Sequence, residues 1–186
     1  ADRALLRPST TSGHLGGGAR ATREAIVLVG AAGFDVGLVE TVGVGQSETM
    51  VAEMVDCFVV LLLARSGDSL QGIKKGILEL ADVLAINKAD GDHEREAQLA
   101  AGELVEAMHL LQPSTAGWMP PVLTCSARDE LRLDDVWAQV QAHRDHLERT
   151  GQIADKRRRQ QVGWMWATVD DRLRSGVRDN PEVRAL

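Results

Sequence analysis

The tetrapeptide Asn87-Lys88-Ala89-Asp90 has the residue types and the spacing to recognise a purine base. A carboxylate at Asp90 can accept hydrogen bonds from both donors on the Watson–Crick edge of guanine, its ring N–H and its exocyclic amine. Adenine offers no such pair, so the carboxylate favours guanine. The amide of Asn87 can bond the other edge and tie neighbouring loops, and the stem of Lys88 can lie along the base. The alternative is a polar strand-to-helix loop in which Asp90 caps the helix.

A second polar segment, Ser126-Ala127-Arg128, follows the next predicted strand along the chain. Small side chains at Ser126 and Ala127 let a backbone N–H approach the carbonyl oxygen of a base. Ser-Ala pairs are common, so this pair is informative only because it comes one strand–helix unit after residues 87–90. Ligands of open α/β sheets bind at the carboxyl ends of the strands, which is where both segments are predicted to lie.

Glu40 and Gly43 have the spacing to contact a metal ion and a phosphate group. An acidic residue at a strand end, three residues before a glycine, can hold a water on Mg²⁺ while the glycine N–H points at a terminal phosphate. The alternative, equally supported by spacing, is a glycine-rich turn before a helix capped by Ser47. Gln46 could orient a hydrolytic water, but its offset from Gly43 makes this the weaker interpretation.

Three further polar groups have simpler interpretations. Asp68 could contact the nucleotide region, although capping of the helix that begins near Leu70 is the preferred reading. The basic run at residues 156–159 is interpreted as a solvated helix face rather than an anion site. None of the histidines has strong metal-site spacing, and His143 and His146 stand beside charged residues, so both are predicted to face solvent.

The elements that must position these residues follow a simple alternation. Short aliphatic runs alternate with segments of helical period, which indicates an α/β fold with a mostly parallel sheet and helices on both faces. Strands are predicted at residues 35–40, 57–63, 83–87 and 122–125. Because residues 57–63 are apolar throughout, they are expected to form a central strand. Helical segments are predicted at residues 22–32, 47–55, 70–80, 99–111 and 133–140.

A different segment begins after Thr150-Gly151. Apolar residues spaced by three and four, from Val162 to Leu173, predict a long amphipathic helix that ends at Asn180-Pro181. We therefore expect an α/β domain at residues 1–150 and a helical extension at residues 151–186.

The composition excludes several classes of protein. The chain has 186 residues, of which 44% are hydrophobic and 26% charged, as in globular proteins with a core. A net charge of −6 argues against extensive nucleic-acid binding. The longest apolar stretch, residues 57–64, is far shorter than the roughly 20 residues that cross a bilayer, so no membrane contact is expected. Cys57 and Cys125 lie in apolar runs, which favours buried thiols over a disulfide and a cytoplasmic location.

A purine nucleotide site also needs groups that neutralise the phosphates, usually a Gly-x-x-x-x-Gly-Lys-Ser/Thr loop. The lysines of the chain are Lys74, Lys75, Lys88 and Lys156, and none has that context. The glycine-rich run at residues 13–18 does not follow a predicted strand. The sequence therefore predicts base recognition without phosphate recognition.

One run of the chain is a highly specific sequence signature: Glu40-Thr41-Val42-Gly43-Val44-Gly45-Gln46-Ser47-Glu48. With it, the chain resembles the MeaB/ArgK family of P-loop GTPases, which assist methylmalonyl-CoA mutase and were formerly described as arginine/ornithine transport ATPases or kinases. The resemblance covers essentially the whole chain. Further matching segments are Arg7-Pro8-Ser9, Ser12-Gly13-His14-Leu15-Gly16-Gly17, Thr22-Arg23-Glu24-Ala25, Gly67-Asp68, residues 70–77, residues 87–90, Pro120-Pro121-Val122, Lys156-Arg157-Arg158 and Trp164-Met165-Trp166.

The resemblance implies a fold of the P-loop NTPase type that binds GTP or GDP and Mg²⁺. Glu40 and Gly43 would form the catalytic switch, with Glu40 reaching the metal through a water molecule. Guanine would be held by six residues: Asn87, Lys88, Asp90, Ser126, Ala127 and Arg128.

The resemblance also implies a second switch loop within residues 67–76, through which the family signals its nucleotide state to the mutase. Its candidate residues are Asp68, Gln71, Lys74 and Lys75. The chain departs from the family at residues 64–66 and 69. Family members are homodimers whose C-terminal helices contribute to the contact, and this would cover Trp164, Trp166 and Val169.

The larger departure is the absence of the N-terminal third of the family fold, with the phosphate loop, its central strand and an upstream Mg²⁺-binding Asp. Loss of a central strand would leave backbone groups unpaired, so we expect a fragment of a longer chain. The resemblance then makes residues 1–150 the C-terminal two-thirds of a GTPase domain and residues 151–186 a dimerisation element. Without the phosphate loop, this chain alone is expected to be inactive.

The leading hypothesis is a GTP-hydrolysing chaperone of methylmalonyl-CoA mutase or a related cobalamin-dependent acyl-CoA mutase. Two alternatives stay open: a non-catalytic dimerising interaction module, and a protein kinase or ATPase linked to amino-acid transport.

Overall fold

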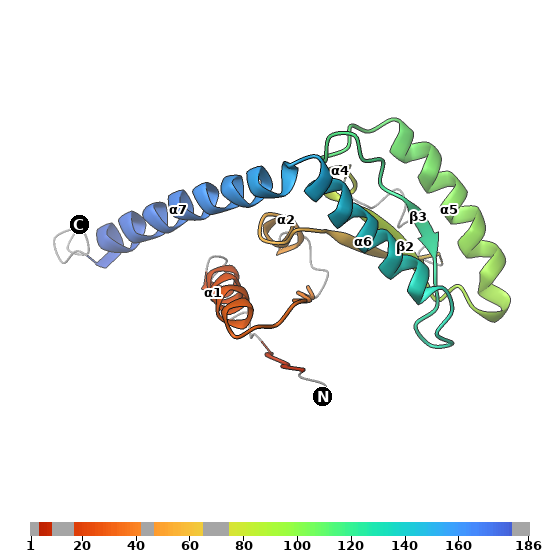
Figure 1. The fold of residues 1–186 in the computed structure, drawn as a ribbon, viewed down its shortest axis with the longest axis horizontal. Helices are drawn as coiled ribbons and strands as arrows, with labels where there is room; N and C mark the ends of the chain where they lie inside the picture. Colours follow the sequence, from red (N-terminus) through yellow and green to blue (C-terminus); the bar gives the residue numbers. More distant parts are fainter. Residues whose placement is uncertain (1–3, 9–16, 42–46, 65–74, 180–186) are drawn as a thin grey trace. The chain divides into compact units, whose positions relative to one another are not determined.

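The computed structural model describes residues 4–8, 17–41, 47–64 and 75–179. The chain divides into two compact units (Figure 1). One comprises Val55–Ala154, and the other comprises Ala1–Met54 together with Asp155–Leu186.

The unit Val55–Ala154 is built on a parallel sheet of three strands in the order β1-β2-β3. The strands are β1 (Val59–Leu63), β2 (Val83–Asn87) and β3 (Val122–Thr124). Val59 is paired with Val83, and Leu84 with Val122. These elements confirm the predicted α/β class and three of the expected strands.

The centre of this sheet is β2, and the expectation that residues 57–63 form the central strand is wrong. Residues Val83, Leu84, Ala85 and Ile86 are all at most 1% exposed. Because successive side chains of a strand point to opposite faces, both faces of β2 are covered. In β1, by contrast, Leu61 is 66% exposed. The apolar run at residues 57–63 therefore predicted a strand correctly, but it did not predict the position of that strand in the sheet.

Helices pack on this sheet and form most of the remaining core. They are α4 (Lys75–Leu80), α5 (Glu94–His109) and α6 (Leu133–Arg149), and a short 3₁₀ turn, η1 (Gly91–His93), precedes α5. Ala97 and Ala100 of α5 pack against Ile86 and Ala89. Both α5 and α6 contact β2.

The inward face of α6 corrects one expectation. His143 is 0% exposed and His146 is 9% exposed. The prediction that both face solvent is therefore wrong. The charged neighbours of both histidines occupy the other faces of the helix, and Leu147 completes the buried stripe. Charged neighbours in sequence were a poor guide because residues adjacent along a helix face different directions.

The other unit holds α1 (Gly17–Ala31), α2 (Ser47–Ala52) and most of α7 (Gln152–Asp179). The predicted strand at residues 35–40 is wrong, because these residues form no strand and Leu38 is 89% exposed. A strand needs a neighbour to satisfy its backbone groups, and the part of the chain that the structure describes provides none for this segment.

The predicted long C-terminal helix is present as α7, whose apolar side chains are largely exposed. The guanidinium carbon of Arg23 lies 5.6 Å from the ring centroid of Trp164. The exposed apolar residues of the helix are Val162, Trp164, Met165, Trp166, Val169, Leu173 and Val177.

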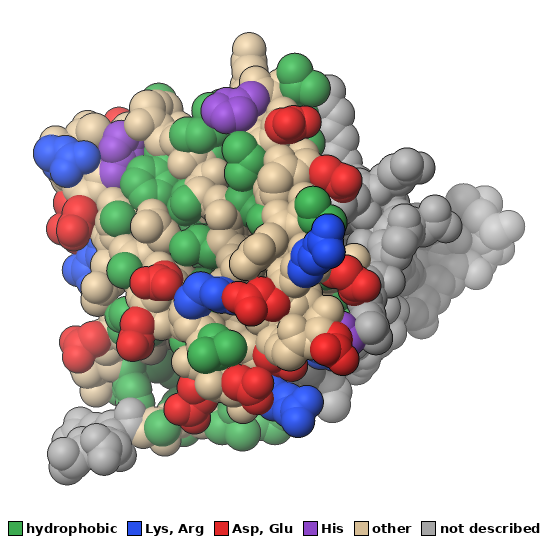
Figure 2. All heavy atoms as spheres, turned by 90° about the vertical axis from the view of Figure 1, so that its right-hand side faces the viewer, with side chains coloured by type: hydrophobic (Ala, Val, Ile, Leu, Met, Phe, Trp, Pro, Cys, Tyr) green, Lys and Arg blue, Asp and Glu red, His purple; other side chains and the backbone are tan. Residues whose placement is uncertain are grey.

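Figure 2 shows the face of the molecule at the α5 end, where acidic, basic and apolar side chains are interspersed. Over the described ranges, no helix combines the length and the apolar character that crossing a membrane requires.

Candidate nucleotide-binding site

The two polar segments predicted to read a base lie side by side at the carboxyl ends of β2 and β3. Parallel pairing brings these ends to the same edge of the sheet. The Cys125 N–H donates to Ile86 O at 2.8 Å, and the Ala89 N–H donates to Cys125 O at 3.0 Å. These bonds continue the strand pairing into the loops and fix residues 87–90 against residues 125–127.

The side chain of Asn87 joins the two loops through a single oxygen atom. Its Oδ1 accepts a hydrogen bond from the Lys88 N–H at 2.8 Å and another from the Ala127 N–H at 3.1 Å. The second bond spans the gap between loops that are distant in sequence. The amide therefore sets the local shape of its own loop and the position of the neighbouring one.

Asp90 is held by Ser126 and does not cap the following helix. The Ser126 hydroxyl donates to Asp90 Oδ2 and accepts from the Asp129 N–H at 3.2 Å. Asp90 precedes the 3₁₀ turn η1, but its side chain makes no cap hydrogen bond there, so the alternative interpretation as a capping residue is wrong. A carboxylate has about four lone-pair sites, so the bond from Ser126 leaves acceptor capacity for two donors of a guanine edge.

The backbone at Lys88 has an uncommon conformation. Its φ is 62°, in the left-handed region that residues with a Cβ rarely adopt. The bond from its N–H to Asn87 helps to hold it there. The side chain is exposed and available to lie along a planar ligand.

Arg132 supports the site, and sequence reasoning missed it. Its Nε donates to Thr124 O at 3.0 Å, and its Nη2 to Ala89 O at 3.4 Å. Its Nη1 also lies 3.3 Å from Glu94 Oε1, at the start of α5. One guanidinium thus links the end of β3, the loop after β2 and a helix. No motif marked it, because its left-handed φ of 57° and its reach across the sheet edge depend on the folded chain.

Cys125 lies beneath this edge and is 3% exposed. Burial raises the pKa of its thiol, and the positive charge of Arg132 opposes that rise. Its Sγ lies 4.0 Å from Asn87 Oδ1. The thiol is therefore a neutral packing group under the loop at neutral pH.

Of the remaining predicted site residues, only Arg128 and Lys75 are described within the unit Val55–Ala154. The Arg128 side chain is 83% exposed and lies 3.6 Å from Asp129. Glu40 is exposed and belongs to the other unit. Lys75 begins α4. Gly43, Asp68, Gln71 and Lys74 lie outside the described residues.

Comparison with known proteins gives a consistent set of relatives. Residues 1–182 match the family model described as methylmalonyl Co-A mutase-associated GTPase MeaB. A probable GTPase of Mycobacterium tuberculosis is 58% identical over 98% of this chain and 54% of its own length. GTPase ArgK of Escherichia coli is 46% identical over 93% of this chain and 52% of its own length.

A mitochondrial relative and a solved structure extend this set. The methylmalonic aciduria type A homolog of Mus musculus is 43% identical over 97% of this chain and 44% of its own length. The crystal structure of a LAO/AO transport system kinase is 39% identical, with a TM-score of 0.80 over 89% of this chain and 53% of that one. The chain thus spans about half the length of the curated relatives it matches.

Proposed function

The chain belongs to the MeaB family of methylmalonyl-CoA mutase-associated GTPases, and from this premise we propose that residues 87–90 and 126–128 bind the guanine base of GTP or GDP. The observation that carries the proposal is the pairing of Asp90 with Ser126 beside the Asn87 bridge. A carboxylate fixed by one hydroxyl and still able to accept two hydrogen bonds matches the donors of guanine and not those of adenine.

Competition binding tests this base recognition. The full-length protein, with its phosphate loop, is expected to bind GDP in preference to ADP, because phosphate contacts supply much of the affinity. Asp90→Asn replaces an acceptor oxygen by a donor amine, so it should weaken GDP binding by about tenfold or more and shift the preference toward xanthosine diphosphate. Asp92→Asn makes the same change at an exposed aspartate two residues away, and should leave the preference unchanged. Unaltered GDP affinity in Asp90→Asn would contradict the proposal.

We further propose that Glu40 and Gly43 serve GTP hydrolysis, with Glu40 holding a water ligand of Mg²⁺. The Glu40 carboxylate is exposed, which suits a group that reaches a metal through water. Glu40→Gln keeps the shape of the side chain and removes its charge. In the full-length protein, it is expected to lower Mg²⁺-dependent GTP turnover while leaving GDP binding intact, because guanine contacts lie elsewhere in the sequence. Unchanged GTP turnover in Glu40→Gln would show that the Glu40 carboxylate takes no part in hydrolysis.

The biological role that we propose is assistance to methylmalonyl-CoA mutase or a related cobalamin-dependent acyl-CoA mutase. The family description and the name of the mouse relative support this role. Co-elution of the protein with the mutase should depend on whether GTP, GDP or no nucleotide is present. Absence of association in all three states would contradict it.

We also propose that the protein is a homodimer that uses α7. The exposed Trp166, Val169 and Leu173 on this helix form an apolar face that association would cover. Trp166→Glu is expected to shift sedimentation toward the monomer, whereas Arg172→Glu, at an exposed charged position of the same helix, should not. A purely non-catalytic dimer would bind GTP without turnover.

A second candidate activity is phosphoryl transfer to a protein, favoured by the name of the solved LAO/AO transport system kinase. Incubation with radiolabelled GTP or ATP and candidate binding proteins distinguishes it. Label in the protein supports a kinase, and label in free phosphate alone supports a GTPase.

A further inference from the structure

A second cluster of chemically active side chains lies at the opposite end of β2 from residues 87–90. Cys57 lies just before β1, Asp82 immediately precedes β2, and His143 comes from α6. One donor atom from each of the three residues lies within 4.8 Å of the others. His143 and Asp82 are 0% and 1% exposed, and Cys57 is partly buried.

Asp82 holds the imidazole in one orientation. Its Oδ1 lies 3.1 Å from His143 Nε2 and also accepts a hydrogen bond from Thr115 Oγ1 at 3.0 Å. Its Oδ2 accepts from the Phe58 N–H at 3.0 Å. A carboxylate beside Nε2 favours the tautomer with the proton on Nε2. The other nitrogen, Nδ1, then carries a lone pair.

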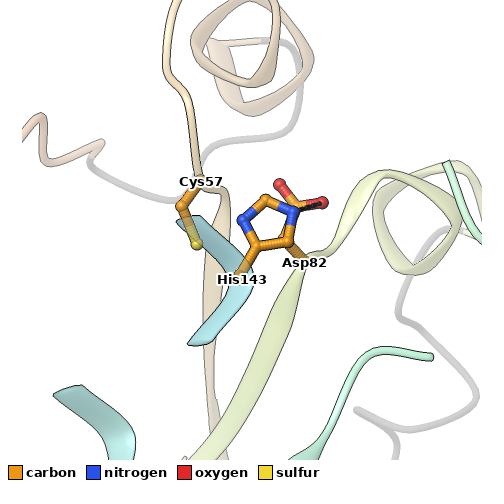
Figure 3. A group of neighbouring side chains, drawn as sticks. All are labelled: Cys57, Asp82 and His143. Atoms are coloured by element: carbon orange, nitrogen blue, oxygen red, sulfur yellow. Dashed lines mark ion pairs between the residues drawn. The ribbon is translucent and has the colours of Figure 1, made fainter. Parts of the chain in front are cut away.

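That Nδ1 atom has no hydrogen-bond partner among the described residues, although it is buried. Leaving such a group unsatisfied costs about 1–3 kcal/mol, so native structures rarely do so without a reason. Figure 3 shows the imidazole between the other two side chains, with one nitrogen toward Asp82 and the other toward the sulfur of Cys57. A lone pair and a sulfur thus face one another across a gap.

We propose that Cys57 Sγ and His143 Nδ1 bind a thiophilic divalent metal ion of the zinc class. Ligand distances of about 2.3 Å to sulfur and about 2.0 Å to nitrogen place two tetrahedral ligands roughly 3.5 Å apart. One ligand atom from each of the three residues lies within 4.8 Å of the others, and Figure 3 shows the sulfur on the Nδ1 side of the ring, so metal binding would require the Cys57 side chain to move to that separation.

Asp82 acts in this site as a positioning residue rather than a ligand. A carboxylate that accepts from the second nitrogen of a metal-binding histidine fixes its tautomer and raises its basicity. Water molecules would complete the coordination, reaching the ion from the side of Cys57, which is only partly buried. The bound ion would connect the start of β1 to α6, so its binding would stabilise the folded chain.

Cadmium titration of the chelator-treated chain tests the site directly. We expect a thiolate-to-cadmium charge-transfer band that saturates at one ion per chain, and competition of that band by Zn²⁺. Cys57→Ser should abolish the band, whereas Cys125→Ser, the same change at the other cysteine, should retain it. Asp82→Asn should keep the band but weaken binding by about 10- to 100-fold.

Thermal unfolding gives a second readout that does not depend on the cadmium spectrum. Zn²⁺ is expected to raise the melting temperature of the unaltered chain and of Cys125→Ser, and to leave that of Cys57→Ser unchanged. Far-UV circular dichroism without metal confirms that each variant is folded. Lack of a band in the unaltered chain, or equal Zn²⁺ affinity in Cys57→Ser, would overturn the proposal.

Discussion

At the scale of single residues, the Asn87 amide supplies contacts that join the two loops of the candidate site. Its one oxygen accepts the N–H groups of Lys88 and Ala127 and so couples two loops. The residue types and strand-end positions of residues 87, 90 and 126 were enough to predict that they lie together, as the structure shows. Their mutual bonds could not be read from the sequence.

Replacing Asn87 by Ala is expected to lower the free energy of unfolding by about 1–3 kcal/mol, from two lost hydrogen bonds at about 0.5–1.5 kcal/mol each. Urea unfolding measures the change. Lys88→Ala is the matched control, because it truncates an exposed neighbouring side chain and keeps the Lys88 N–H that Asn87 binds. The control should stay within about 0.5 kcal/mol of the unaltered chain. Equal effects of the two substitutions would show that the bridge contributes nothing.

The buried thiol of Cys125 predicts a loss of stability at alkaline pH. Burial raises its pKa in the folded chain, whereas the unfolded thiol titrates near pH 8.5. The stability that the buried Cys125 thiol contributes is therefore fully present below about pH 8.5. It is lost as pH rises through the folded pKa, because the unfolded chain releases the thiol proton first. Urea unfolding between about pH 7 and pH 10 should show a steeper decline for the unaltered chain than for Cys125→Ala. Identical slopes would contradict this.

At the scale of elements, the sequence patterns predicted where strands and helices lie along the chain. They were a poorer guide to which elements lie next to one another in space. The run at residues 83–87 was predicted as a strand and forms β2, but its central place depends on burial by α5 and α6. The segment at residues 35–40 has the same aliphatic character and forms no strand. Periodicity reports which residues suit a sheet, whereas pairing requires partners that one segment cannot specify.

The turn from β3 to α6 offers a prediction that separates backbone strain from side-chain contacts. Arg132 has a φ of 57° and donates to Thr124 O and Ala89 O. Both Arg132→Ala and Arg132→Gly lose these contacts, but only glycine relieves the left-handed backbone, which costs other residues about 1–2 kcal/mol. The free energy of unfolding of Arg132→Gly is therefore expected to be about 1 kcal/mol higher than that of Arg132→Ala. Denaturant unfolding of the two variants measures the difference, and the reverse order would show that strain is not stored there.

At the scale of the whole molecule, the core is concentrated in one of the two units. Among the described residues, every buried apolar side chain except Val51 lies within Val55–Ala154. The division could not be predicted from the sequence, because α1 is as regular in helical period as α5. What distinguishes them is burial, which depends on what each helix packs against.

This difference predicts uneven amide hydrogen exchange. The amides of β2 and α5 should exchange much more slowly than those of α1 and α7, since local opening is easiest where few apolar groups are buried. Mass spectrometry at low and high protein concentration measures both protection and association. Protection in α7 that rises with concentration supports its proposed role in dimerisation. Equal protection of β2 and α7 at low concentration would contradict the concentration of the core in one unit.

The exposed Leu61 and Leu63 of β1, at 66% and 43%, have a practical consequence for purified protein. Within the described ranges the sheet ends at this strand, and apolar edge strands are templates on which a strand from another molecule can add. Crowded samples should therefore grow non-native aggregates through β1 in competition with any orderly association of α7. Binding constants for this chain should therefore be measured in dilute solution. Only then do they describe the folded protein rather than its aggregates.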